Sequence, residues 1–130
     1  VMFPGFNNSD MLHRMLLCKG ALHKKVIKAH IRACKKTRDG DAPHLYFHEK
    51  SFHFIYRLSD GSHLSPMIIP REPAKDRTIH AMLQASMPSH SDEGEMKLVE
   101  RLADILERCS NMNRNWRFGA VDALRHDFFN

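Results

Sequence analysis

Features that define several common protein classes are scarce in this sequence of 130 residues. Its three cysteines, Cys18, Cys34 and Cys109, are too few and too widely spaced for a disulfide framework, which favours a reducing compartment. No stretch approaches the roughly 18 apolar residues needed to cross a bilayer, so we expect no membrane partner. The N-terminus lacks the basic-then-apolar order of a signal peptide. It begins with Val1 rather than Met, as expected of a segment of a longer protein.

Acidic residues are missing from residues 11–38, a stretch that holds nine Lys and Arg residues and contributes to a net charge of +5. Such a block is typical of a solvated helix face, and this simpler interpretation is favoured. It is also typical of a surface that meets phosphate, on nucleic acid or on a phosphorylated partner. No aromatic residue lies between Phe6 and Tyr46, so a platform for stacking bases is missing. Residues 19–38 therefore predict only a weak nucleic-acid contact.

Metal ligands are also poorly represented. Ten histidines are present, and the densest group is His44, His48 and His53. No Cys pair and no His-Glu-x-x-His sequence accompanies them, so we expect no zinc site. Hydrophobic residues make up 42% of the chain and charged residues 27%, which indicates a globular chain of at most one domain.

Apolar periodicity and breakers predict a mainly α chain. In the first helix, Asn8 or Ser9 is the expected cap, Asp10 suits the first turn, and Gly20 ends the helix. The helices predicted in this way are residues 9–19, 23–35, 77–85, 95–109 and 119–124.

One segment favours β structure. Apolar residues alternate with polar ones in residues 45–58, which predicts two strands joined by a short turn, a small β-hairpin. Residues 67–69 predict a short buried strand that ends at Pro70. The fold class expected from the sequence is therefore mainly α with a small β-hairpin insert.

The C-terminal residues carry a recognisable pattern. Leu124, Phe128 and Phe129 would form an apolar plug at the end of the last helix. The pattern also resembles the end of a protein kinase catalytic domain, where an Arg precedes a helix that ends Ala-Leu-x-His-Pro-Phe. Asp127 stands where that family usually has Pro, and Gly119 where it has Ser or Thr. The residues that match are Arg117, Ala123, Leu124, His126 and Phe128.

The N-terminal residues match the same family in the same order. The Phe-Pro-Gly turn, the acidic residue in the following helix and the Lys-Gly at its end resemble the CMGC kinases. The resemblance is greatest to the pre-mRNA-processing factor 4 kinases. It implies that residues 1–130 form the C-terminal portion of the large helical lobe, with an insert at roughly residues 33–91. The residues that match are Phe3, Pro4, Gly5, Asp10, Lys19 and Gly20.

The resemblance implies further properties for a full-length protein. These are ATP and magnesium as cofactors, a protein substrate, the rest of the kinase domain as partner, and an intracellular, nuclear location. It also implies that Arg117 pairs with a Glu of the activation segment, which precedes this chain. The Gly-rich loop, the Val-Ala-x-Lys strand, the His-Arg-Asp loop and Asp-Phe-Gly are all missing from the sequence. We therefore expect no catalytic, cofactor-binding or metal-binding residue and no activity of the chain alone.

Two alternatives remain open. The chain could be a free-standing basic module that binds nucleic acid or a protein partner through residues 19–38. It could also be a degenerate kinase remnant that binds partners without catalysis. The upstream coding sequence would distinguish the three hypotheses.

Overall fold

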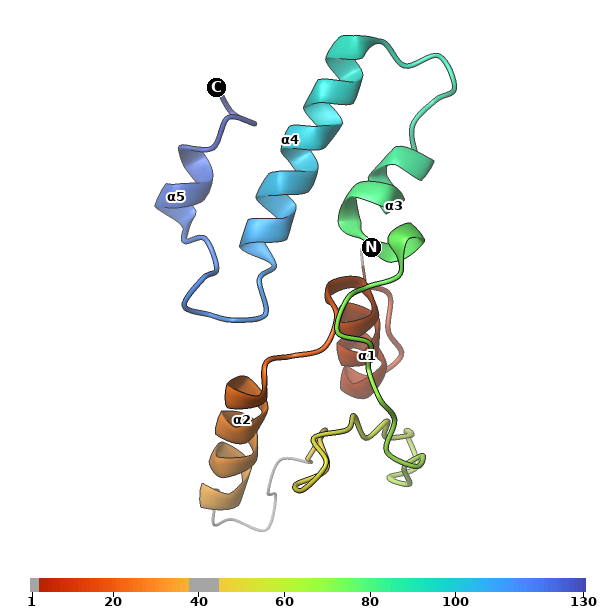
Figure 1. Cartoon of the computed structure of the whole chain (residues 1–130), viewed down its shortest axis with the longest axis vertical. Coiled ribbons are helices and arrows are strands. Elements are labelled where there is room, and N and C mark those ends of the chain that lie inside the picture. The colour runs from red at the N-terminus through yellow and green to blue at the C-terminus, as the bar shows by residue number, and fades with distance from the viewer. Residues whose placement is uncertain (1–2, 38–44) are drawn as a thin grey trace. The chain divides into compact units, whose positions relative to one another are not determined.

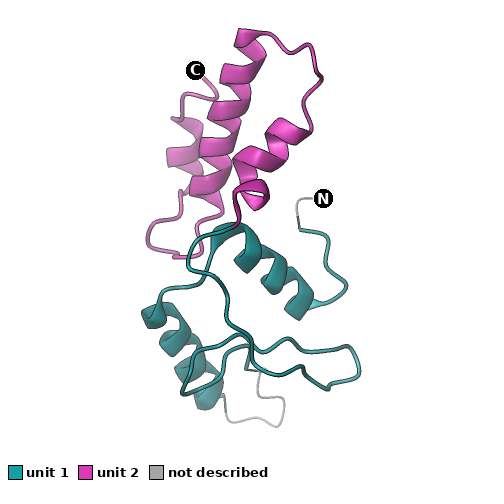
Figure 2. Cartoon of the chain, turned by 45° about the vertical axis from the view of Figure 1, so that its right-hand side comes forward, with its two compact units in different colours: residues 1–73 teal, residues 74–130 magenta. Residues whose placement is uncertain are grey.

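The computed structural model describes residues 3–37 and 45–130 and is mainly helical, as predicted (Figure 1). The elements in chain order are α1 (Asn8–Lys19), α2 (Lys24–Lys36), the 3-10 turn η1 (Lys75–Arg77), α3 (Ile79–Ala85), α4 (Glu93–Cys109) and α5 (Ala120–Leu124). The chain divides into two compact units, Val1–Pro73 and Ala74–Asn130 (Figure 2).

Helix α1 begins one residue earlier than the sequence predicted. Asn7 is the cap, because its extended backbone turns the side chain back so that Oδ1 accepts a hydrogen bond from Asp10 N at 2.8 Å. The expectation that Asn8 or Ser9 caps the helix is therefore wrong. Gly20 ends the helix as predicted, and its N–H donates to Leu16 O at 2.8 Å.

Helix α2 packs through a narrow apolar face. Ile27, Ile31 and Cys34 are buried and lie about one helical turn apart. His23 caps the helix, and its Nδ1 accepts a hydrogen bond from Lys25 N at 3.2 Å. The predicted loop after this helix lies largely outside the described residues.

The predicted β-hairpin is not formed, since the described part of the chain contains no strand. Single antiparallel pairings occur instead, Phe47 with Phe54, Phe54 with Met67, and Arg57 with His63. Each pairing is one residue pair long, because the backbone changes partner along the segment. Phe54 exchanges two 2.8 Å hydrogen bonds with Met67, while its neighbour Ile55 donates to Tyr46 O at 2.8 Å. The buried strand predicted at residues 67–69 is also wrong, since Ile68 is 74% exposed.

The core of the first unit is aromatic. Phe54 is fully buried, and its ring stacks on the His13 ring at 5.4 Å. The rings of Phe47 and Tyr56 meet it edge to face at 5.9 and 6.3 Å. The apolar positions that suggested a hairpin therefore fill a core against α1 rather than one face of a sheet.

The second unit is built around α4. This helix begins with a capping box, in which Asp92 Oδ1 accepts from Glu95 N at 2.8 Å and Glu95 Oε2 accepts from Asp92 N at 3.1 Å. Helix α3 packs against α4. The helix predicted at residues 77–85 is interrupted at Thr78, whose Oγ1 accepts from Ala81 N and so starts α3. Helix α5 lies beside α4 in both views (Figures 1 and 2).

The apolar plug predicted at the C-terminus is not formed. Leu124 is 68% exposed and Phe129 is 58% exposed. Phe128 is half-buried, and its ring meets the Phe129 ring edge to face at 5.1 Å. The side chains of Leu124 and Phe129 therefore form an exposed apolar surface and do not fill a core.

We predict that Gly20→Ala lowers the free energy of unfolding by about 2 kcal/mol or more. Gly20 has φ +83° and ψ 179°, a conformation that residues with a Cβ rarely adopt. A Cβ there would also collide with Arg71 O and lie 3.0 Å from Arg71 C. Urea unfolding of parent and variant measures the loss.

Gly61→Ala is the matched control for this experiment. Gly61 also has a positive φ of +88°, but a Cβ there would meet nothing within 4 Å. We expect it to cost only about 1 kcal/mol, the conformational penalty without the collision. Equal losses at Gly20 and Gly61 would contradict the close approach of the Arg71 backbone.

Candidate functional site

The predicted site residues at the N-terminus gather where the chain enters α1. Phe3, Pro4 and Gly5 form the turn before the helix. A Cβ on Gly5 would lie 2.7 Å from Met11 N and would overlap the Met11 side chain. Only glycine therefore allows the turn to lie directly on the helix, which gives a structural reason for the Phe-Pro-Gly sequence.

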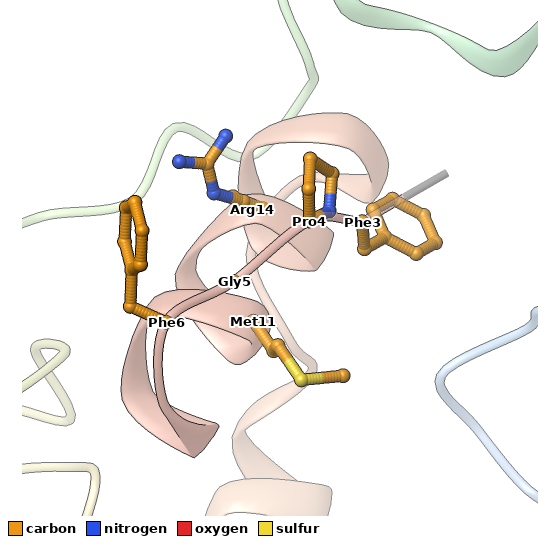
Figure 3. Close-up of a pocket in the computed structure, with 6 residues that line it drawn as sticks. All are labelled: Phe3, Pro4, Gly5, Phe6, Met11 and Arg14. Carbon is orange, nitrogen blue, oxygen red and sulfur yellow. The ribbon is translucent and has the colours of Figure 1, made fainter. Parts of the chain in front are cut away.

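An open cavity of about 560 Å³ lies at this turn (Figure 3). Phe6, which is 94% exposed, and the Arg14 guanidinium lie on one side of Gly5, and the Phe3 ring lies on the other. The lining is apolar apart from Arg14. Such a surface is suited to binding an apolar group rather than to chemistry. The lining residues are Phe3, Pro4, Gly5, Phe6, Met11 and Arg14.

Asp10 holds this turn on α1. Its carboxylate is buried and accepts hydrogen bonds from Phe6 N at 3.2 Å, from Arg14 Nε at 3.2 Å, and from the Tyr56 hydroxyl. Burial raises the pKa of Asp10, but the hydrogen bonds from Phe6, Arg14 and Tyr56 together outweigh it and leave this pKa below its usual value. Burial, followed by the bond to Asp10, raises the pKa of Tyr56.

The remaining predicted residues of the first unit lie at the other end of α1. Lys19 is half-buried in the last turn of the helix, and Gly20 follows it. Ala21 N donates to Pro70 O at 2.8 Å, so the segment that ends at Pro70 is held against the chain just after α1. The motif residues of the first unit thus mark the two ends of α1, where backbone passes close to the helix.

The predicted residues of the second unit do not form one site. Ala123 is half-buried, whereas Arg117 and Leu124 are exposed. Arg117 Nε donates to Asn111 O at 2.8 Å, and no carboxylate of the described residues lies within ion-pair distance of its guanidinium. The ion pair that the resemblance implies for Arg117 stays a prediction.

His126 has two defined partners. Phe128 N donates to His126 Nδ1 at 3.1 Å, so Nδ1 carries no proton in this arrangement. The proton is then on Nε2, which donates to Asp104 Oδ2 at 2.8 Å. Hydrogen bonds from Arg108 and then His126 hold the pKa of Asp104 below its usual value. His126 thus joins the C-terminal turn to α4.

Sequence reasoning missed several partners of these residues. Ser9 is buried, and its Oγ accepts from Arg57 N at 2.8 Å. Tyr56 bonds to Asp10, and Asp104 bonds to His126. The i,i+4 spacing of Asp104 and Arg108 was a readable signal for an ion pair, which forms at 3.0 Å. No local signal indicated the other contacts, because each joins segments more than 20 residues apart.

The described ranges hold neither a metal-binding cluster nor a membrane-spanning helix. No group of three or more His, Cys, Asp and Glu side chains in residues 3–37 and 45–130 is placed to hold a metal ion. His44, one of the three histidines considered above, lies outside these ranges. No helix in them is long and apolar enough to span a membrane.

Two curated relatives align with almost the entire chain. The serine/threonine-protein kinase prp4 of Schizosaccharomyces pombe is 30% identical over 133 residues, which cover 99% of this chain and 24% of that kinase. The serine/threonine-protein kinase prpf4B of Dictyostelium discoideum is 25% identical over 132 residues, covering 98% of this chain and 14% of that kinase. The chain is similar to Prp4-type serine/threonine kinases over nearly its whole length. The resemblance inferred from the motifs is confirmed.

The alignments also show how much of each relative this chain covers. The chain spans about a quarter of the length of one relative and about a seventh of the other. No protein-family model matches the chain.

We predict that Asp10→Asn lowers stability at neutral pH and flattens its decline in acid. The folded pKa of Asp10 is below the unfolded value of about 3.9. The ionised carboxylate therefore stabilises the fold above that unfolded value, and the contribution is lost as pH falls through the folded pKa. Urea melts between neutral pH and pH ~3 measure the difference. Asp76→Asn, on an exposed residue, is the control, and an equal flattening there would contradict the prediction.

Arg117→Ala and His126→Ala should separate a motif residue with one solvent-exposed hydrogen bond from a less exposed one with two. We expect Arg117→Ala to change the free energy of unfolding of this chain by less than about 0.5 kcal/mol, because its guanidinium is exposed. His126→Ala removes two hydrogen bonds and should cost about 2 kcal/mol. Urea melts of the two variants test the contrast. A loss of several kcal/mol on Arg117→Ala would mean that the Arg has a strong partner within this chain.

Proposed function

We propose that this chain forms the C-terminal portion of the helical lobe of a Prp4-type serine/threonine protein kinase of the CMGC group. The observation that carries the proposal is the alignment, which covers 99% and 98% of the chain but only 24% and 14% of the two kinases. A sequence that aligns from end to end with part of a larger enzyme is expected to form the corresponding part of a similar enzyme. The mainly helical structure supports this assignment.

In the full-length protein, the proposed activity is transfer of phosphate from ATP, with magnesium, to a protein substrate in the nucleus. Phosphoryl transfer requires a Lys that holds the phosphates, an Asp that orients the attacking hydroxyl, and Asn and Asp ligands for magnesium. The sequence motifs that carry these residues are missing from this chain. Its role is therefore structural, and ATP and magnesium would bind upstream.

The segment that faces substrates or partners is proposed to be the Phe3–Gly5 turn with α1. The exposed Phe6 ring, the cavity beside it and the nearby Arg14 guanidinium support this role, since they offer an apolar contact next to a positive charge. Asp10 and Gly5 would act through positioning, because they hold the turn against the helix. Residues 33–91 would correspond to the insert of the pre-mRNA-processing factor 4 kinases.

We predict that the isolated chain transfers no phosphate and that ATP with magnesium does not raise its melting temperature. Phosphate transfer and the rise in melting temperature with ATP and magnesium should both appear when the native upstream coding sequence is attached. The measurements are incorporation of labelled phosphate into a generic basic protein substrate and a thermal shift with nucleotide. A preparation carrying a substitution of the upstream His-Arg-Asp aspartate is the control for contaminating kinases.

Each outcome bears on a different hypothesis. Turnover by the isolated chain that survives repurification would contradict a purely structural role. An upstream sequence with no His-Arg-Asp loop and no Asp-Phe-Gly would instead favour a degenerate remnant or a free-standing module.

A further inference from the structure

One sector of α2 consists entirely of cations. At about 100° per residue, six side chains fall within an arc about 120° wide and about 18 Å long, and no other residue of the helix projects into that arc. All six are exposed. We call this surface the basic stripe, and its residues are Lys24, Lys25, Lys28, Arg32, Lys35 and Lys36.

The basic stripe opposes folding of its own helix. Lys24, Lys28, Arg32 and Lys36 follow one another at i,i+4, and like charges at this spacing repel. The first turn of α2 contains no acidic residue, so Lys24 and Lys25 lie at the unfavourable positive end of the helix dipole, while Lys35 and Lys36 lie at its favourable negative end. A sequence that only needed a soluble helix would not require this arrangement.

Helix α4 shows how the same chain builds an ordinary solvated face. Its outer surface mixes both signs, with ion pairs between Glu93 and Lys97 at 2.6 Å and between Asp104 and Arg108 at 3.0 Å. Both pairs have the i,i+4 spacing with the acid first, which stabilises a helix. The contrast between the two helices favours a binding surface on α2 over a merely solvated one.

The turn at residues 49–52 contacts two cations of the basic stripe. Lys28 Nζ lies 5.7 Å from the centre of the Phe52 ring, and Lys35 Nζ forms a 2.8 Å ion pair with Glu49 Oε2. Within the described residues, no carboxylate lies within ion-pair distance of the other four cations. Among the described residues, these four of the six cations thus have no carboxylate partner, and their charge can attract an external anion.

We propose that the basic stripe docks an extended, serine-phosphorylated segment of a protein partner. Cations at i,i+4 are about 6 Å apart along the helix, which matches alternate residues of an extended peptide at about 6.6 Å. The six side chains include no aromatic ring, and the Phe52 ring beside them already contacts Lys28 Nζ, which disfavours single-stranded nucleic acids that bind by base stacking. The inference goes beyond the kinase assignment and holds whether or not the chain is part of an active enzyme.

The test is fluorescence anisotropy with the full 130-residue chain. The probe is a short labelled peptide with phosphoserine at every second position. The stripe variant carries Lys24→Gln, Arg32→Gln and Lys36→Gln. The control variant carries Lys75→Gln, Arg114→Gln and Arg125→Gln, which are exposed and lie outside α2. Both variants remove three charges, so the net charge falls from +5 to +2 (5 − 3 = 2) in each.

We expect the stripe variant to bind the peptide about tenfold more weakly and the control variant to change less than about twofold. Binding should weaken as salt is raised, because the contacts are exposed ion pairs. Equal weakening by both variants would reduce the effect to net charge and overturn the proposal. Equal binding of the same peptide with unmodified serine would also overturn it. The proposal would also be overturned if single-stranded RNA of equal charge displaced the labelled peptide at a lower concentration than the unlabelled peptide does.

A second measurement needs no ligand. Removing three of the repelling charges should raise the thermal midpoint of the stripe variant above that of the parent, while the control variant should not rise. A midpoint that falls in the stripe variant would show that these charges support the fold, and the case for a binding surface would fail.

Discussion

The first unit depends on a buried carboxylate that is fully hydrogen-bonded. The Asp10 carboxylate accepts hydrogen bonds from Phe6 N in the turn before α1, from Arg14 in the next turn of α1, and from the Tyr56 hydroxyl in the segment that follows α2. A buried charge is tolerated only when such partners compensate its lost hydration. One residue therefore fixes three segments together. The position of the Phe-Pro-Gly turn, and of the exposed Phe6 beside it, follows from that requirement.

Signals within a few residues of each other predicted the helices well. Contacts between segments far apart in the sequence left no signal that could be read. The end of α1 at Gly20 was predicted correctly because its cap acts within a few residues, whereas α4 begins at Glu93, two residues before the predicted start, because Asp92 caps it. The β-hairpin prediction was wrong because alternating apolar and polar residues occur both in a strand and in a segment that packs single aromatic rings into a core. Phe54 fills such a core against His13 of α1. The C-terminal plug was wrong because burial of Leu124 needs a surface to cover it.

The sequence motifs name residues but not the contacts that those residues make. The motifs marked Gly5, Gly20 and His126, yet the reasons for them lie elsewhere in the chain. Gly20 is needed because the Arg71 backbone crosses it about 50 residues later, and His126 bonds to Asp104 on another helix. A motif records which residue occurs at a position. The physical cause is a distance between segments, and only the folded chain contains that distance.

The basic stripe shows how a fold can carry charges that oppose it. Three like-charge pairs at i,i+4 cost roughly 1 kcal/mol together, at about 0.2–0.5 kcal/mol each. On the buried face of the same helix, Ile27 and Ile31 each contribute about 1.5–3 kcal/mol by leaving water. The apolar face therefore outweighs the repulsion by several kcal/mol. Because packing alone secures α2, its outer face is free to concentrate one sign of charge for a partner, whereas α4 neutralises its charges locally.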